Sequence, residues 1–159
     1  FSFFNAFGAN PPIVVFSPTL RRDSTKKDTL LNLENLGEFV VHASVASLAE
    51  KVNLTSKEVP PSESEVSLAG LTTVPSVKVK PPRIAESPVA LECLVKQIVP
   101  CGTGPIAANL VIGEVVMMHV ADEVLDGKGG VDPRKLQTVA RLGGAFWCHT
   151  ADLFEQQRP

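Results

Sequence analysis

The sequence has few cysteines and no strong excess of charge of either sign. Its three cysteines, Cys93, Cys101 and Cys148, are too few and too scattered for the disulfide framework of a small secreted protein. We therefore expect a reducing, cytoplasmic location. Fifteen basic and seventeen acidic side chains give a net charge of −2. This balance argues against a general nucleic-acid binder, because such a protein needs a broad basic face.

Long apolar runs and the common catalytic motifs are also missing. No apolar run approaches the ~20 residues of a membrane-spanning helix. The sequence has no GxSxG motif, which places the nucleophile of many hydrolases. Its three histidines lie far apart, with no partner at the spacing of a metal site. We therefore expect no membrane partner, no metal ion and no catalytic nucleophile or acid–base pair.

What is present is the composition of a globular protein built from short elements. The 159 residues are 44% apolar and 20% charged, which fits about one domain. Thirteen prolines and eleven glycines divide the chain into short pieces and so favour strands and loops. Short β-rich runs predict strands at 13–16 and 38–42. Alternation of apolar residues predicts two more strands, one from Val89 and one over 109–120.

Helix signals are fewer than strand signals. Asp28 is placed to cap a helix that runs to Leu36, where Gly37 stops it. A second short helix is predicted at 47–53, and Pro133 starts a third. Because the strands are short and outnumber the helices, the sequence predicts an antiparallel β-barrel with short helices between strands.

A compact basic segment precedes the first predicted helix. Residues 21–27 contain four basic side chains and one acidic one, on a chain that is acidic overall. The segment leads into a helix whose first turn offers free N–H groups and the positive end of the dipole. Hydroxyl groups of Ser24, Thr25 and Thr29 add neutral donors. This pattern favours a phosphate site; the alternative is a solvated lysine-rich loop that binds nothing.

Aromatic side chains gather in the opening segment. Phe1, Phe3, Phe4 and Phe7 alternate with small and polar residues ahead of a Pro-Pro turn. Such side chains can flank a flat heteroaromatic ring and form hydrogen bonds with its edge. The alternative is an ordinary barrel strand whose phenylalanines lie in the core.

Several segments together carry a resemblance to a known family. They occur in the same order over nearly the whole chain: FSFFNAFG with PPIVVFS (1–17), KDT with Asn32 and GEFVV (27–41), LAE with Asn53 (48–56), LAGL (68–71), PRIAESPVALEC (82–93), IGEVV (112–116) and RLGG (141–144). The chain thereby resembles the flavin reductase-like, FMN-binding split-barrel family. The resemblance implies a mainly β, antiparallel split β-barrel with a few short helices, forming a single domain over 1–159. It also implies a homodimer with FMN near the subunit interface, and strands ahead of Phe1 that this sequence does not contain.

The resemblance also implies which residues bind FMN. Residues of the opening segment would lie along the isoalloxazine ring: Ser2, Phe3, Phe4, Asn5 and Ala6. Ser17 would lie near the ring or the ribityl chain. Lys27 and Thr29 would contact the phosphate, with Asp28 capping the helix beneath it.

Three residues farther along the chain complete this implied site. Asn53 would approach the cofactor from the second short helix. Arg141 and Gly143 would lie close to the flavin or across the dimer.

The function implied by the resemblance is flavin reduction by NADH or NADPH, with hydride transfer from the nicotinamide to the N5 atom of the flavin. This chemistry belongs to the cofactor, so it needs no nucleophile from the protein. One alternative is a non-catalytic, flavoredoxin-like FMN electron carrier that a partner protein reduces. Another is a barrel that has lost its cofactor and serves in protein contacts.

Overall fold

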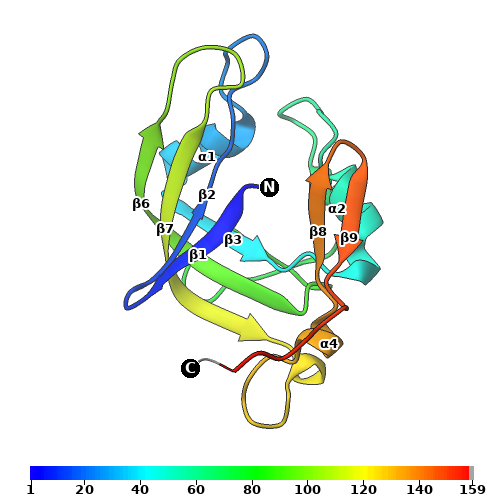
Figure 1. Cartoon of the computed structure of the whole chain (residues 1–159). Coiled ribbons are helices and arrows are strands. Elements are labelled where there is room, and N and C mark those ends of the chain that lie inside the picture. Colours follow the sequence, from blue (N-terminus) through cyan, green and yellow to red (C-terminus); the bar gives the residue numbers. More distant parts are fainter. Residues whose placement is uncertain (158–159) are drawn as a thin grey trace. The chain divides into compact units, whose positions relative to one another are not determined.

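The computed structural model describes residues 1–157 as two compact units. The first contains Phe1–Val41, Thr73–Arg83 and Ala90–Met118, and the second contains His42–Thr72, Ile84–Val89 and the residues from His119 onward. The expectation of a single domain over 1–159 stays a prediction, as do the strands expected ahead of Phe1. The elements are shown in Figure 1: β1 (Phe4–Ala9), β2 (Pro12–Phe16), α1 (Asp28–Leu36), β3 (Glu38–His42), a 3₁₀ turn η1 (Ala46–Leu48), α2 (Ala49–Leu54), α3 (Glu65–Leu68), β4 (Thr73–Val74), β5 (Arg83–Ile84), β6 (Val89–Pro100), β7 (Asn109–Val120), a 3₁₀ turn η2 (Asp122–Val124), α4 (Pro133–Leu136), β8 (Val139–Gly143) and β9 (Phe146–His149).

The main sheet has five strands in the order β1-β2-β7-β6-β3. β1 and β2 form an antiparallel hairpin, and β2 pairs antiparallel with β7. The strands predicted at 13–16, 38–42 and 109–120, and the one predicted from Val89, are confirmed. The expected fold class, mainly β with short helices, is also confirmed.

Helix α1 covers one face of this sheet through its apolar side chains. Leu30 and Leu33 are buried, and Leu33 packs with Phe16 and Phe39 in the core cluster. The helix ends at Leu36 because Gly37 adopts the left-handed conformation (φ 69°) and donates its N–H to the Leu33 carbonyl at 2.9 Å.

The expected cap of α1 is wrong. Asp28 is the first helical residue, and Lys27, with extended backbone, holds the cap position. The Lys27 carbonyl accepts the N–H groups of Leu30 and Leu31 at 2.9 and 3.2 Å. The Asp28 carboxylate instead accepts from Arg21 at 3.0 Å. An arginine seven residues upstream therefore draws this side chain away from the capping role.

Close packing in the core leaves no room for a side chain at one position of β7, which is a glycine. A Cβ atom on Gly113 would lie 2.3 Å from Cζ of Phe39, well inside van der Waals contact. The Phe39 ring also packs on Phe16, with centroids 5.2 Å apart. Gly113 thus lets the β3 aromatic side chain lie directly against the backbone of β7.

The second unit contains the β8–β9 hairpin and short helices. The Val139 N–H donates to the Ser44 carbonyl at 2.9 Å, which links the start of β8 to the segment ahead of η1 and α2. The predicted third helix is present as α4, capped by Asp132, whose Oδ1 accepts the N–H of Arg134 at 2.8 Å. Among residues 1–157, none of the helices has the length and apolar character needed to cross a membrane.

Candidate functional site

The basic side chains ahead of α1 differ in whether other groups of the protein already bind them. Arg21 binds the Asp28 carboxylate and the Lys26 carbonyl. The Nζ atom of Lys26 lies 2.7 Å from the Glu34 carboxylate. The ammonium group of Lys27 forms no ion pair with any described residue. Lys27 is therefore the half-buried cation at the start of the helix that is left to bind an external anion.

Backbone donors surround that cation. The N–H groups of Lys27, Asp28 and Thr29 donate to no acceptor within the described chain, as expected for the first turn of a helix. The positive end of the α1 dipole lies at the same place. Uncommitted N–H groups, a hydroxyl on Thr29 and an ammonium group can together bind a phosphate.

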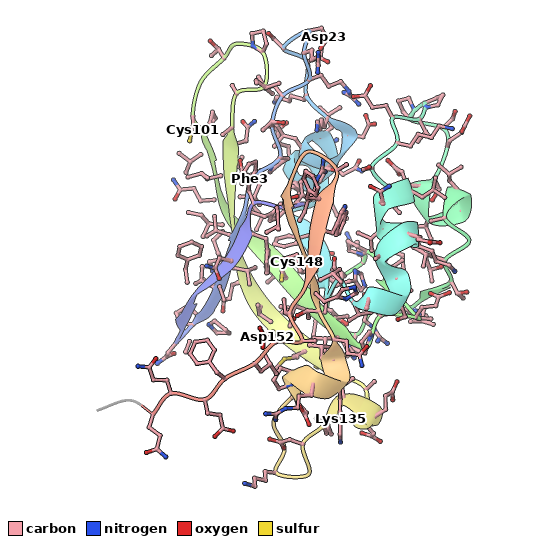
Figure 2. The ribbon with its side chains drawn as sticks, turned by 45° about the vertical axis from the view of Figure 1, so that its right-hand side comes forward. Phe3, Asp23, Cys101, Lys135, Cys148 and Asp152 are labelled. Atoms are coloured by element: carbon pink, nitrogen blue, oxygen red, sulfur yellow. The ribbon has the colours of Figure 1, made fainter. Side chains whose placement is uncertain are left out.

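The tip of the loop between β2 and α1 is a tight local turn around Asp23 (Figure 2). Asp23 Oδ1 accepts the hydroxyl of Thr25 at 2.6 Å and the Thr25 N–H at 2.9 Å. These two hydrogen bonds hold the pKa of Asp23 below its usual value. The hydroxyl of Thr25, which was predicted to contribute to the phosphate site, is thus already used within the turn.

The aromatic side chains of the opening segment are exposed. Phe1, Phe3 and Phe7 have 64%, 71% and 66% of their surface accessible, and Phe4 has 41%. In the described structure these side chains therefore do not lie in the core, where the alternative interpretation expected them. β1 is the outermost strand of the five-stranded sheet, so only one side of it is paired with another strand.

The register of β1 against β2 decides which side chains share a face. Phe4 lies opposite Phe16 and Asn5 lies opposite Val15, so Phe4 faces the core side of the sheet. Asn5 faces the other side, and its Oδ1 accepts the N–H of Ala6 at 2.8 Å. The register thus places Phe4 and Asn5 on opposite faces of β1.

Ser17 has a buried hydroxyl without a partner. Its Oγ atom is inaccessible to solvent, and it forms no hydrogen bond to any residue from 1 to 157. The Ser17 N–H donates to the Phe3 carbonyl at 3.1 Å, so the hydroxyl lies where β2 ends beside the start of β1. Because a buried polar atom without a partner costs free energy, Ser17 stays a candidate for contact with a ligand.

The remaining predicted residues belong to the second unit. Asn53 is exposed near the end of α2, and its carbonyl accepts the hydroxyl of Ser56 at 2.6 Å. Arg141 is exposed on β8 and donates to the Gly144 carbonyl at 3.1 Å, within its own hairpin. Gly143 has a positive φ of 129° at the irregular step of that hairpin. Their role in binding a cofactor stays a prediction.

Sequence reasoning missed a carboxylate clamp in the first unit. Glu92 is fully buried on β6 and accepts the N–H groups of Val77, Lys78 and Val79 at 2.8, 2.5 and 3.2 Å. Glu38 on β3 accepts the next N–H, that of Lys80, at 2.7 Å. The two glutamates thus bind four consecutive backbone amides. The local sequence pattern does not predict these hydrogen bonds, because the amides belong to a proline-rich loop that is distant in sequence from the glutamates.

These features define a class before any comparison. Among the described residues, a mainly antiparallel sheet carries an exposed aromatic edge strand, an unpartnered buried hydroxyl and a cationic helix start, which define a mainly β protein with a candidate anion site. The domain family described as "Flavin reductase like domain" matches residues 1–139. The chain therefore belongs to the flavin reductase-like domain family.

Individual relatives agree with this membership. An uncharacterized protein of Halalkalibacterium halodurans is 43% identical over 161 residues, covering all of this chain and 77% of the relative. The structure of nitrilotriacetate monooxygenase component B from Bacillus cereus is 36% identical, with a TM-score of 0.91 over 98% of this chain and 77% of that one. A Shewanella frigidimarina protein with a split barrel domain, 23% identical, matches with a TM-score of 0.85 over 99% of this chain and 76% of that one, which supports the predicted split-barrel fold.

Proposed function

We propose that this protein binds FMN and reduces it with NADH or NADPH. The phosphate would bind at the start of α1, where the Lys27 ammonium and the N–H groups of Asp28 and Thr29 are uncommitted. Asp28 would act indirectly, since its carboxylate holds Arg21 at 3.0 Å and so keeps that guanidinium beside the site. The arrangement suits a dianion, because charge-assisted hydrogen bonds to phosphate are strong.

The observation that carries the proposal is the unpartnered buried hydroxyl of Ser17. Its Oγ atom lacks a hydrogen-bond partner among the described residues, although it is out of contact with solvent. A ribityl or ring oxygen of FMN would supply the missing partner. The nearby edge strand offers Asn5 for the ring edge, and its exposed phenylalanines offer apolar surface that a planar ring would cover.

The reaction needs little from the protein beyond binding and orientation. When bound, FMN supplies the redox chemistry by accepting a hydride from the nicotinamide and passing electrons to an acceptor. The chain would fix the cofactor through Lys27, Thr29 and Ser17. Arg141, exposed on β8, and Asn53, exposed on α2, stay proposed cofactor contacts.

A second copy of the chain is proposed as the partner. The β8–β9 hairpin forms a separate two-stranded sheet, and its Leu142 and Phe146 side chains are 69% and 76% exposed. A two-stranded hairpin with exposed apolar side chains is marginally stable by itself. A homodimer that covers this hairpin would stabilise it. Light scattering after size exclusion should give the mass of a dimer, and Phe146→Ser should shift the protein toward the monomer.

The rival function is a flavoredoxin-like carrier, and the test separates it from the reductase. The visible absorption spectrum of the purified protein should show bound flavin after incubation with FMN. Rapid mixing with NADH or NADPH should then bleach that absorption on the timescale of catalysis. Slow bleaching by both nucleotides would favour the carrier, and a protein that takes up no FMN would contradict both functions.

A further inference from the structure

An open groove of the first unit lies along α1, beyond the start of the helix. Its volume is about 460 Å³, which is within the range of binding pockets. Along the helix it extends from Thr29 to Leu36, roughly 10 Å at 1.5 Å per residue. The other walls come from β3 and from the segment 80–82. This length accommodates about three residues of an extended peptide, since each adds about 3.3 Å.

The loop wall of the groove is held in place by the carboxylate clamp. Glu92 and Glu38 accept the N–H groups of four consecutive residues, 77–80. Glu92 also lies 3.9 Å from the guanidinium of Arg83, just after the segment that lines the groove. Removing a carboxylate from water is costly, so the fold uses an expensive group to fix this loop. Because the loop is fixed on both sides of 80–82, the groove exists before any partner binds.

The side chains that this fixed loop presents to solvent are apolar and cationic. Val77 is 63% exposed, and Lys78 and Lys80 are exposed, whereas Val79 between the two lysines is buried. Neither lysine ammonium forms an ion pair with a described residue. Glu38, which also lines the groove, already accepts the Lys80 N–H at 2.7 Å. The loop thus carries a preorganised positive edge on a chain whose net charge is negative.

The helix wall of the groove offers hydrogen-bonding groups and apolar surface. Thr29, Asn32 and Leu36 lie three and four residues apart, so they share one face of α1. The side-chain amides of Asn32 and Asn35 are exposed and form no hydrogen bond within residues 1–157. Because such an amide both donates and accepts, it matches the N–H and C=O groups of a peptide backbone. Leu36, 39% exposed, and Pro81 provide apolar surface beside these amides.

We infer that this groove docks an extended, acidic segment of a partner protein. A large apolar side chain of the segment enters the groove, and its carboxylates lie against Lys80 and Lys78. The asparagine amides of α1 bind its backbone. An open groove would leave much of a small ligand in water, whereas an extended segment contacts the helix and the loop together. The inference goes beyond the proposed function, since Thr29 is the one residue of the groove that is also a proposed contact of FMN.

The test uses a defined acidic peptide and alanine variants of exposed lysines. The probe is a capped, fluorescently labelled heptapeptide, DELDLED, whose two leucines lie on the same side of an extended chain. It is titrated with FMN at saturation, so that the start of α1 is occupied. We expect Lys80→Ala to raise the Kd of the peptide about tenfold, the effect of one charge-assisted contact, with smaller increases for Lys78→Ala and Asn35→Ala. Lys128→Ala, which removes an exposed lysine of the second unit, should leave it unchanged.

Fluorescence polarisation separates the outcomes. No saturable binding of the peptide below about 1 mM, or equal losses for Lys80→Ala and Lys128→Ala, would overturn the inference. So would equal binding of DEGDGED, because the attraction would then come from charge alone. If FMN displaces the peptide, the peptide occupies the start of α1, and the inference fails while the proposed function stands. If FMN does not bind to the wild-type protein, the proposed function fails, and the same titrations without FMN decide the inference.

Discussion

Two segments of the first unit present backbone N–H groups in succession, and they use them in opposite ways. In residues 77–80 every N–H is bound by a glutamate of the sheet, and one of these glutamates, Glu92, is fully buried. In residues 27–29 the N–H groups have no acceptor in the described part of the chain, and the Lys27 side chain is unpaired.

This difference distinguishes residues 77–80, which support the fold, from residues 27–29, which form the proposed phosphate site. A buried carboxylate whose acceptor capacity is filled by backbone amides rigidifies the fold and has little left for a ligand. A helix start with open donors is incomplete without an anion. Loss of the first kind of residue should therefore change stability, and loss of the second kind should change ligand affinity.

The largest effect is expected from Glu92→Leu. This change leaves the amides of Val77, Lys78 and Val79 without an acceptor, and we expect it to lower the free energy of unfolding by about 3–5 kcal/mol. Urea denaturation measures the loss. Glu114→Gln is the matched control, because Glu114 also lies on a sheet strand but pairs with Lys96 at the surface, at 2.9 Å. It should cost below about 1 kcal/mol. If the two variants lost the same unfolding free energy, the buried glutamate would not differ from the surface one in its contribution to stability.

Lys27→Ala tests the other side of the comparison. We expect FMN binding to weaken by about 1.5–3 kcal/mol with no change in the unfolding midpoint, because the ammonium has no partner among the described residues to lose. Lys26→Ala, which breaks only the exposed contact with Glu34, is the control. Calorimetric titration with FMN measures both. Unchanged affinity for Lys27→Ala would take this residue out of the site.

Gly113→Ala probes the packing beneath the proposed site. The new Cβ would lie 2.3 Å from Cζ of Phe39, and we expect a loss of about 1–3 kcal/mol in unfolding free energy. Gly104→Ala is the control, since its Cβ would meet nothing within 4 Å and it has no positive φ. Thermal unfolding of both variants compares them. A neutral Gly113→Ala would mean that β3 and β7 are less closely packed than the structure shows.

The smallest effect on stability at neutral pH is expected from the ionisation of the Cys93 thiol. Burial first, and the charge of Glu92 second, raise the pKa of the Cys93 thiol from 9.0 to about 12. At pH 8 a thiol reagent should therefore modify the exposed Cys101 of the folded protein and leave Cys93 protected. Because the unfolded chain loses this proton first, the Cys93 contribution to stability should decline as the pH rises from 9.0 toward 12. Rapid labelling of Cys93 in Cys101→Ser would contradict this.

Local pattern was enough to predict much of the sheet and the first helix. Alternation placed β7 and the start of β6, and Gly37 ended α1 where predicted, because period and turn chemistry are local properties. The role of Asp28 was wrong because its partner, Arg21, is brought to it by the loop. The β8–β9 hairpin was missed although Gly143-Gly144 between alternating residues is a recognisable turn signal.

The candidate site was predictable in part. Lys27 and Thr29 followed from charge and from the position of a helix start. The buried hydroxyl of Ser17 and the clamp of Glu92 did not, because burial depends on packing between segments distant in sequence. The exposure of Phe3 and Phe7 likewise depends on which elements cover the faces of β1, which composition alone does not reveal.

The central claim is that the open start of α1 binds the phosphate of FMN. Comparing the affinities of the wild-type protein for FMN and for riboflavin, which lacks the phosphate, tests it most directly. We expect FMN to bind at least about 100-fold more tightly, with most of that difference lost in Lys27→Ala. Equal affinities for the two flavins would contradict the claim.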